Sequence, residues 1–234
     1  MSFYFSKVQL SRQPQDRELL QSLSCHGDAY RDHALIWRLF PGDGMRRDFL
    51  FRRQKDEAGP LSYYVVSQRA PQPVPGMLAV QSKPYQPQLA TGDWLRFDLR
   101  ANPVIARKAE VGTSRRHDVL MDAKKQVEQS EMRDELDKSD QANRSNEAMN
   151  AAALQWLFKR APEWGLSLRE ESVLPTGYSQ HRLRHGGRQI AFSSLDYHGL
   201  AQVTDPERLA KALTLGVGRA RGFGCGLLLV RRVD

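Results

Sequence analysis

Strand and helix patterns follow one another in the same order in both halves of the chain, and this duplication constrains the fold most strongly. Aromatic and β-branched segments predict strands, and apolar residues at helical spacing predict helices. In the first half we expect a strand at 3–11, a short helix at 14–23, a helix at 28–40, and strands at 47–53, 61–69 and 77–82. In the second half we expect a strand at 93–104, a helix at 148–161, strands at 168–173, 178–184 and 188–196, a helix at 205–216 and a strand at 226–233.

The second half follows the order βαββαβ with a split strand in its middle, and the first half follows the same order with a short connection in place of the second helix. Two such units in tandem predict an α+β protein with paired ferredoxin-like domains, the architecture of RNA-recognition modules. We place the domains at 1–88 and 89–234, and the second contains a charged insertion at about 107–147.

Capping residues mark the ends of two of the expected helices. Asp28 is expected to cap the helix 28–40, which Pro41 ends. Asp205 is expected to cap the later helix, with Pro206 in its first turn. On a helical wheel, one face of the helix 28–40 carries four residues: Ala29, His33, Ile36 and Phe40.

The chain is basic, with a net charge of +8 over 234 residues and a pI near 9.7. A pI above about 9 favours a polyanionic partner, and a basic protein without such a partner is the plain alternative. Segment 107–147 holds nine basic and ten acidic residues, so the rest of the chain carries a net charge of +9. This distribution favours a shaped binding surface over a charged tail.

The cysteine content and the lack of long apolar runs indicate the cellular compartment of the protein. The two cysteines, Cys25 and Cys225, form no CxxC pair, so we expect no zinc site, and their small number fits a reducing compartment. The N-terminus shows no charged leader with a long apolar run, and no stretch approaches the roughly 18 apolar residues of a membrane span. We therefore expect a cytoplasmic protein without a membrane segment.

Tyr30 and His33 are three residues apart on the expected helix, so they lie about 60° apart around its axis. Histidine can move a proton near neutral pH, and tyrosine can hydrogen-bond a ribose 2′-OH or a phosphate. The pair therefore suits RNA cleavage. The spacing alone favours the plainer interpretation, an amphipathic helix with a boundary tyrosine and a core histidine.

Five of the 17 glycines lie between Gly216 and Gly226, together with two arginines. Glycine lets backbone N–H groups approach an anion, and arginine adds bidentate contacts to phosphate. The run follows a helix, leads into a strand and lacks GK[ST], so it does not match a P-loop or dinucleotide fingerprint. A turn that holds an RNA phosphate or sugar and a plain glycine-rich turn both remain open. The candidate RNA-binding residues here are Gly218, Arg219, Arg221 and Gly222.

Segment 181–188 predicts a β-hairpin with a Gly-Gly tip between basic side chains. Such a hairpin can enter a groove or grip the backbone of an RNA stem, and a solvated hairpin is the alternative. His181 and His185 would suit a metal site on a helix, but Gly-Gly argues against a helix, so we expect no metal. The candidate RNA-binding residues of the hairpin are Arg182, Arg184 and Arg188.

Alternate positions of the strand 93–104 carry polar side chains, which predicts one charged sheet face. These residues are Arg96, Asp98, Arg100 and Asn102. Arg96 and Arg100 are candidate RNA contacts, and a merely solvated face is the alternative. The segment RRHDVLMDAK begins the charged insertion, and its periodicity gives it no clear role.

Taken together, these segments resemble the CasE family, the endoribonucleases that cleave CRISPR repeat RNA in type I-E systems. The resemblance covers essentially the whole chain, and the ordered set of motifs is specific. Its carriers are FYFSKVQLSR, YRDHALIWRLFPG followed by RRDFLFR, FDLRANPV, RRHDVLMDAK and GVGRARGFGCGLLLV.

The resemblance implies two ferredoxin-like domains that bind the stem-loop of the CRISPR repeat and cleave at the 3′ base of the stem. It implies metal-independent cleavage without a cofactor, 2′,3′-cyclic phosphate and 5′-OH ends, and continued binding of the mature crRNA within the Cascade complex with its other subunits. The family's catalytic tyrosine and histidine match Tyr30 and His33, and its RNA-gripping hairpin and loop match the two basic segments above. His26 is a competing histidine. The resemblance implies no function for the charged insertion.

Three other classes of protein are alternatives to this one. A non-catalytic RNA-binding module of the same fold needs only arginines and aromatic residues, and His33 would then be structural. A two-histidine phosphoesterase needs two HxT or HxS motifs, and none of the six histidines has Thr or Ser two positions later. A metal nuclease is disfavoured because the sequence shows no convincing carboxylate cluster.

Overall fold

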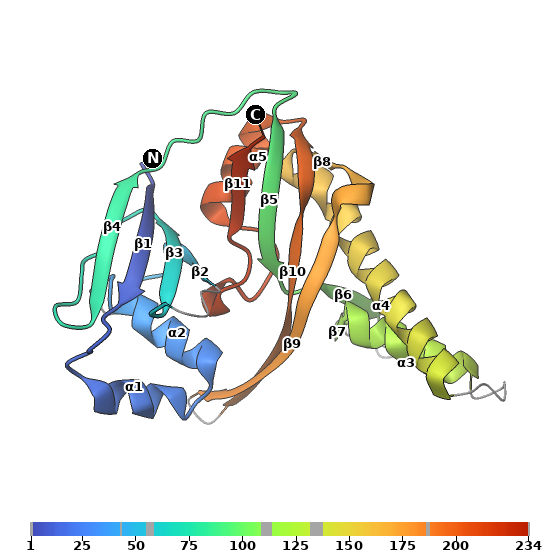
Figure 1. Ribbon diagram of the computed structural model, residues 1–234, viewed down its shortest axis with the longest axis horizontal. Coiled ribbons are helices and arrows are strands. Elements are labelled where there is room, and N and C mark those ends of the chain that lie inside the picture. The colour runs from blue at the N-terminus through green and yellow to red at the C-terminus, as the bar shows by residue number, and fades with distance from the viewer. Residues whose placement is uncertain are drawn as a thin grey trace.

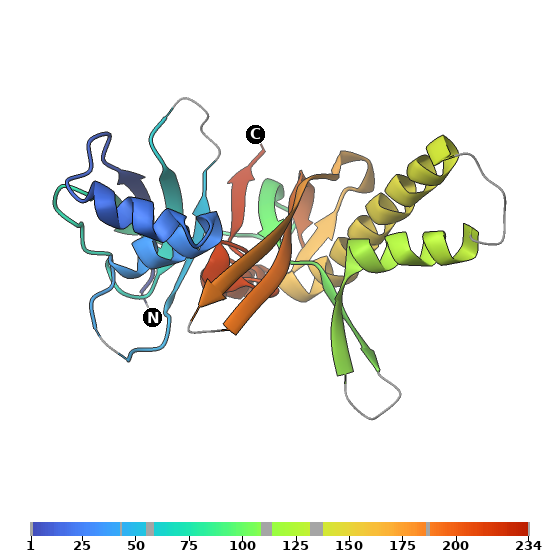
Figure 2. The ribbon, with the colours of Figure 1, turned by 90° about the horizontal axis from the view of Figure 1, so that it is seen from below.

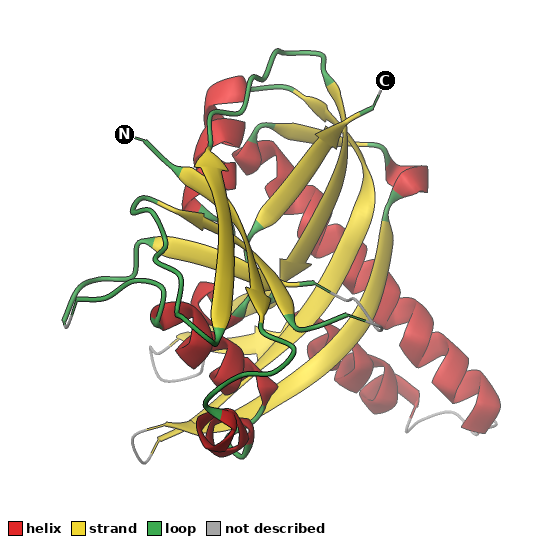
Figure 3. Ribbon diagram, turned by 60° about the vertical axis from the view of Figure 1, so that its left-hand side comes forward, coloured by secondary structure: helices red, strands yellow, loops and turns green. Residues whose placement is uncertain are grey.

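Two antiparallel sheets stand side by side, and helices pack against both of them (Figures 1 and 3). The structure, a computed structural model, describes residues 2–42, 44–54, 59–108, 114–131, 138–185 and 188–233. The predicted α+β class with tandem ferredoxin-like units is confirmed. The boundary that we place between residues 88 and 89 remains a prediction.

The first unit forms a four-stranded sheet in the order β2-β3-β1-β4. Its elements are β1 (Tyr4–Leu10), α1 (Arg17–Ser24), α2 (Asp28–Trp37), β2 (Phe49–Arg53), β3 (Ser62–Ser67) and β4 (Leu78–Pro84). Residues 68–77 join β3 to β4 without a helix, as the predicted short connection requires. Its core gathers apolar side chains of α2 and the strands, among them Leu35, Ile36, Phe51 and Tyr63.

The second unit repeats this strand order as β11-β5-β10-β8, and β9 pairs with β10 as well. Its sheet and covering helices are β5 (Trp94–Ala101), α4 (Lys138–Arg160), β8 (Leu166–Leu168), β9 (Leu174–His185), β10 (Arg188–Val203), α5 (Pro206–Leu215) and β11 (Leu228–Arg232). In both sheets the first strand of the unit lies between the third and the last. The split strand is confirmed as β8 and β9, but the strand expected at 168–173 is wrong because residues 170–172 form a 3₁₀ turn.

Helix α2 differs from its prediction at the cap and on its buried face. Gly27, at φ 95°, occupies the cap position and turns the chain from α1 into α2, so Asp28 is the first helical residue and its predicted capping role is wrong. The fully buried face carries Asp32, Leu35 and Ile36 rather than a stripe through Ala29 and His33. The Tyr63 hydroxyl donates to the Asp32 carboxylate at 2.7 Å, which satisfies this buried group.

The charged insertion is more regular than predicted. It forms a hairpin of β6 (Val104–Lys108) and β7 (Ser114–Asp118), then α3 (Val119–Glu131) and the first half of α4, which begins ten residues earlier than expected. The two helices pack against each other and project from the body (Figure 2). The start of α3 and the second half of α4 pack into the core of the second unit, through Leu120, Trp156 and Leu157 among others.

An apolar seam and a group of ion pairs join the two sheets. Leu50 and Val66 of the first unit are buried against Leu227 of the second. Nearby, Arg52 of β2 reaches Asp98 of β5 at 2.7 Å. The joint places α2 of the first unit beside the chain between α5 and β11 of the second.

None of the described helices is both long and apolar enough to cross a membrane.

Candidate active site

His33 lies where the first unit meets the glycine-rich segment of the second. Its Nδ1 is 2.7 Å from the carbonyl oxygen of Gly222, and a carbonyl oxygen can only accept a hydrogen bond. Nδ1 therefore carries a proton and donates it to Gly222. A proton that His33 exchanges with a substrate has to pass through Nε2, because Nδ1 is already hydrogen-bonded to the Gly222 carbonyl.

A row of rings holds the imidazole on its other sides. The Phe223 ring lies 5.3 Å from the His33 ring, and the Trp37 ring lies 6.2 Å from it. Phe223 also stacks on Phe192 of β10 at 5.3 Å, and Phe192 stacks on His181 of β9 at 4.6 Å. The row therefore connects His33 with the outer part of the long β9–β10 hairpin, where His181 pairs with Phe192.

The loop that contacts His33 packs closely against its neighbours at two glycines. At Gly226, with φ 82°, a Cβ atom would lie 2.3 Å from the Val217 carbonyl oxygen. At Gly222 a Cβ atom would lie 2.8 Å from Nη1 of Arg47 and 3.8 Å from Nδ1 of His33. Glycine at these positions lets the loop close on itself and lie against α2.

Tyr30 and the competing His26 lie together at the junction of α1 and α2, with ring centres 5.1 Å apart. His26 is exposed, whereas Tyr30 is half-buried. The Gly222 contact distinguishes His33 from His26, because it fixes the ring of His33 against the second unit.

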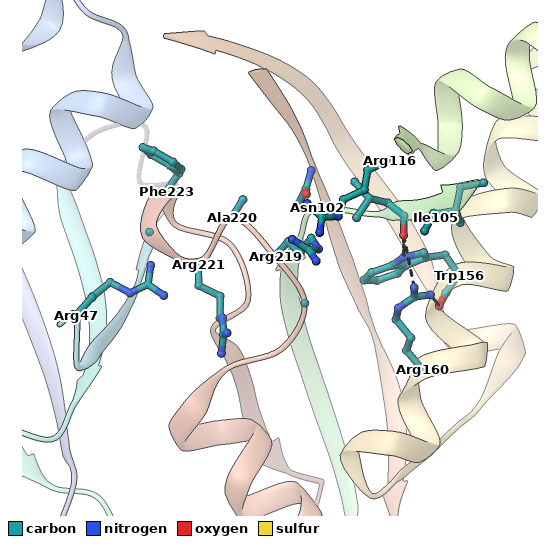
Figure 4. A pocket seen from close by; sticks show the side chains of 14 residues that line it. Arg47, Asn102, Ile105, Arg116, Trp156, Arg160, Arg219, Ala220, Arg221 and Phe223 are labelled. Atoms are coloured by element: carbon teal, nitrogen blue, oxygen red, sulfur yellow. Dashed lines mark hydrogen bonds between the residues drawn. The ribbon is translucent and has the colours of Figure 1, made fainter. Parts of the chain in front are cut away.

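An arginine-rich cavity of about 720 Å³ opens beside His33 on the glycine-rich loop. Its basic residues come from both units: Arg47, Arg116, Arg160, Arg219 and Arg221. No aspartate or glutamate lines it among the described residues. Figure 4 shows Arg47 and Arg221 near one end, and Trp156 with Arg160 at the other. A cavity with this charge attracts a polyanion.

A second cavity of about 540 Å³ shares Arg116, Arg219 and Phe223 with the first and extends toward the β9–β10 hairpin. Arg182 and His181 line it. Burial, followed by the charge of Arg100, lowers the pKa of His181, whose Nε2 lies 2.8 Å from the Ser194 hydroxyl. The two cavities together form a basic, partly aromatic groove that leads from the hairpin to His33.

The structure gathers some of the predicted site residues and separates others. Gly218, Arg219, Arg221 and Gly222 line the first cavity, and Arg182 lines the second. The remaining RNA-binding candidates lie on β5 and at the far end of the long hairpin.

Arg96 and Arg100 point from β5 into different surroundings. Arg96 is exposed and lines a separate hollow with Lys83 and Arg231. Arg100 donates to both carboxylate oxygens of the buried Asp196, at 2.7 and 3.0 Å. The charged face predicted for this strand is wrong at Asn102, which is 5% exposed and whose side-chain amide donates to the main-chain carbonyl of Ser193.

The long hairpin reaches the junction of α1 and α2, where Gly27 approaches the main chain of Arg182 (Figure 1). Arg184 and Arg188 lie on β9 and β10 at its far end, in adjacent register pairs of the two strands. Their side chains and the Gly-Gly tip at 186–187 lie outside the described residues. No group of three or more potential metal ligands occurs in the part of the chain that the structure describes.

Sequence reasoning missed three arginines of the first cavity. Arg47 precedes a strand, Arg116 lies in a segment without clear periodicity, and Arg160 closes a helix that was predicted for its apolar face. Arg160 lies over the Trp156 ring at 4.6 Å. These arginines are far apart in sequence, so no local pattern marks them as one group.

Comparison with known proteins gives consistent relationships. The chain is 28% identical over 206 residues to the CRISPR system Cascade subunit CasE of Escherichia coli, covering 86% of this chain and 90% of that protein. It is 27% identical over 206 residues to the CRISPR-associated endoribonuclease Cse3 of Thermus thermophilus, covering 84% of this chain and 79% of that protein.

The fold matches a solved structure of the CRISPR endoribonuclease Cse3 bound to 19 nt RNA, with a TM-score of 0.70 and 23% identity. That match covers 98% of this chain and 99% of the other. The family model described as CRISPR associated protein matches residues 3–232. With nearly its whole length matched, the chain belongs to the CRISPR-associated protein family described by that model.

Proposed function

We propose that the protein is a metal-independent endoribonuclease that binds the stem-loop of a CRISPR repeat and cleaves the precursor transcript. The observation that carries this proposal is the His33 ring, fixed through Nδ1 by the Gly222 carbonyl at the edge of an arginine-lined cavity. The relative from Thermus thermophilus is an endoribonuclease by name, which supports the same reaction class for this chain.

The proposed reaction is an internal transesterification. The ribose 2′-oxygen forms a bond to the neighbouring phosphorus as its proton leaves, and the bond from phosphorus to the 5′-oxygen breaks as that oxygen gains a proton. The products then carry 2′,3′-cyclic phosphate and 5′-OH ends. His33 exchanges one of these protons through Nε2, as base toward the 2′-OH or as acid toward the 5′-oxygen.

The remaining residues bind and orient the RNA. Tyr30, near the start of the same helix, orients the 2′-OH or the phosphate. Arg219 and Arg221 stabilise negative charge on the phosphate, and placing the reacting atoms in line lowers the barrier further. The hairpin arginines Arg182, Arg184 and Arg188 grip the stem, and Arg96 and Arg100 are further proposed RNA contacts.

After cleavage, the protein is proposed to stay bound to the mature crRNA and to join the other Cascade subunits. Retention of the product fits a site with one identified proton-transfer residue and modest turnover. We also place the protein in the cytoplasm, where the precursor transcript is made. Fractionation of cells that carry a tagged chain tests this location, and recovery in a membrane or exported fraction would refute it.

The second candidate is a non-catalytic RNA-binding module of the same fold, favoured by the many arginines that would suffice for binding. A repeat RNA incubated in EDTA with wild type or with His33→Ala separates the two functions. The endoribonuclease proposal expects cutting by wild type alone, binding by both proteins, and no cutting of RNA with a 2′-deoxyribose at the scissile position. Binding without cutting by wild type would favour the module.

A further inference from the structure

Arg47 joins the first unit to the edge of the proposed cleavage site. It lies between α2 and β2, whereas Arg221 belongs to the glycine-rich loop of the second unit. Figure 4 shows the two side chains close together beneath the loop. Because a single methyl group on Gly222 would lie 2.8 Å from Arg47 Nη1 and 3.8 Å from His33 Nδ1, the arginine and the histidine flank one small space.

The positive charge of Arg47 lacks the compensation that other half-buried or buried arginines of this protein have. Arg31 pairs with Asp32 at 2.9 Å, and Arg52 pairs with Asp98 at 2.7 Å. Among the described residues, Arg47 forms no ion pair with a carboxylate, and its Nε is buried without a hydrogen-bond partner. A half-buried guanidinium in this state is costly unless an anion arrives to bind it.

A second arginine beside it increases this cost. Burial and then the neighbouring charge of Arg221 lower the pKa of the Arg47 guanidinium. Arg221 is held in place because its Nη1 donates to the Leu215 carbonyl at 2.7 Å. Two like charges converge here, and the binding of one anion between them would relieve the repulsion.

The far end of the cavity is arranged differently. Arg160 stacks over Trp156 and donates to the main-chain carbonyls of Trp156 and Val104, both at 3.4 Å. Its guanidinium is therefore already partly engaged. The two arginines with converging charges, Arg47 and Arg221, lie at the end next to His33.

We propose that Arg47 is a further catalytic residue, which binds a non-bridging oxygen of the scissile phosphate and, with Arg221, stabilises the charge that builds up there in the transition state. This inference rests on the proposed endoribonuclease function. A guanidinium suits the role because it presents two parallel N–H donors to two phosphate oxygens. The proton transfers remain with His33 and its unidentified partner, so Arg47 supplies charge without gaining or losing a proton.

Single-turnover cleavage of a repeat RNA at saturating protein tests the proposal. Arg47→Gln is expected to slow cleavage about 100-fold, the usual effect of removing one donor to a developing oxyanion. Its Kd for the RNA is expected to change by less than about fivefold, because many other phosphate contacts remain. Arg47→Lys is expected to retain an intermediate rate, since it keeps the charge but loses the planar pair of donors.

Two further variants distinguish a loss of catalysis from a defect in folding. Arg46→Gln removes the same charge from the exposed neighbouring residue and is expected to cleave within about threefold of wild type. Arg47→Ala is expected to recover part of its rate when guanidinium ions are added at low millimolar concentration, which a purely structural defect would not do.

The outcomes distinguish this inference from the function on which it rests. If wild type cleaves and Arg47→Gln cleaves within threefold of it, the inference is wrong and the proposed function stands. A loss of rate fully explained by weaker RNA binding, or a slow Arg47→Ala that guanidinium does not rescue, would also overturn the inference. If wild type itself does not cleave, both the function and the inference fail.

Discussion

Replacing Arg52 with methionine is expected to destabilise the joint between the two units by about 3 kcal/mol. The Arg52 side chain is 7% exposed, and its Nη2 lies 2.7 Å from Asp98 and 3.8 Å from Asp196, which is 1% exposed. Breaking a buried ion pair by removing one partner typically costs about 3 to 5 kcal/mol. The low end applies because Asp98 is 39% exposed and Arg100 still pairs with Asp196 in the variant.

Urea unfolding measures this loss, and Arg53→Met is the matched control. Arg53 is 34% exposed and its partner Asp28 is 64% exposed, so this substitution is expected to cost less than about 1 kcal/mol. With an m-value of about 3 kcal/mol/M, the Arg52→Met midpoint should fall by about 1 M relative to wild type. Equal, small shifts for both variants would refute the reasoning that the buried ions hold the units together.

Three other predictions concern the pH dependence of stability, the loop and RNA binding. Hydrogen bonds from Arg69 lower the pKa of Asp48, so this pair stabilises the fold above the ordinary value of 3.8 and loses its effect as pH falls below it. Asp48→Asn should therefore lower the free energy of unfolding by about 1 kcal/mol at pH 7, and thermal melts should show this difference vanish in acid; a constant difference would contradict it. Gly226→Ala should cost at least about 2 kcal/mol in urea unfolding, because its Cβ would lie 2.3 Å from the Val217 carbonyl oxygen and φ is 82°, and an unchanged midpoint would count against this packing. Repeat-RNA affinity should fall about 1,000-fold between 50 and 200 mM salt in filter binding, whereas an affinity independent of salt would exclude phosphate contacts as its source.

Local sequence signals predicted those elements that short-range chemistry determines. Asp205 accepts a hydrogen bond from the main chain at the start of α5, and Pro206 occupies the first turn, as predicted. The alternation along β5 predicted its buried residues correctly, because side chains of a strand point to opposite faces. The succession of strands and helices along both units followed from the repeated pattern of elements.

Tertiary contacts determined what the sequence could not predict. Asp28 is of a residue type that commonly caps helices. The turn at Gly27 nevertheless makes it a helical residue, and it pairs with Arg31 and Arg53. The pairing of Arg100 with Asp196 joins residues 96 positions apart, which no periodicity reveals. The same holds for Arg47, which reaches the cavity through the packing of one unit on the other.

The proposed site was predicted in part. The helix pattern located Tyr30 and His33, and the family resemblance gave them a role, but neither indicated which imidazole nitrogen could move a proton. The Gly222 carbonyl supplies that answer, because it engages Nδ1 from a loop 189 residues away. The sequence marked this loop through its glycines without indicating that it contacts His33.

The central claim is that His33 moves a proton in RNA cleavage, and single-turnover rates of His33→Ala and His26→Ala on a bound repeat RNA test it most directly. The account predicts that His33→Ala slows cleavage by at least about 100-fold with RNA binding retained, since general acid–base catalysis contributes about 10² to 10⁴ in rate. It predicts that His26→Ala, which alters an exposed ring, cleaves close to the wild-type rate. A fast His33→Ala, or a loss confined to His26→Ala, would contradict it.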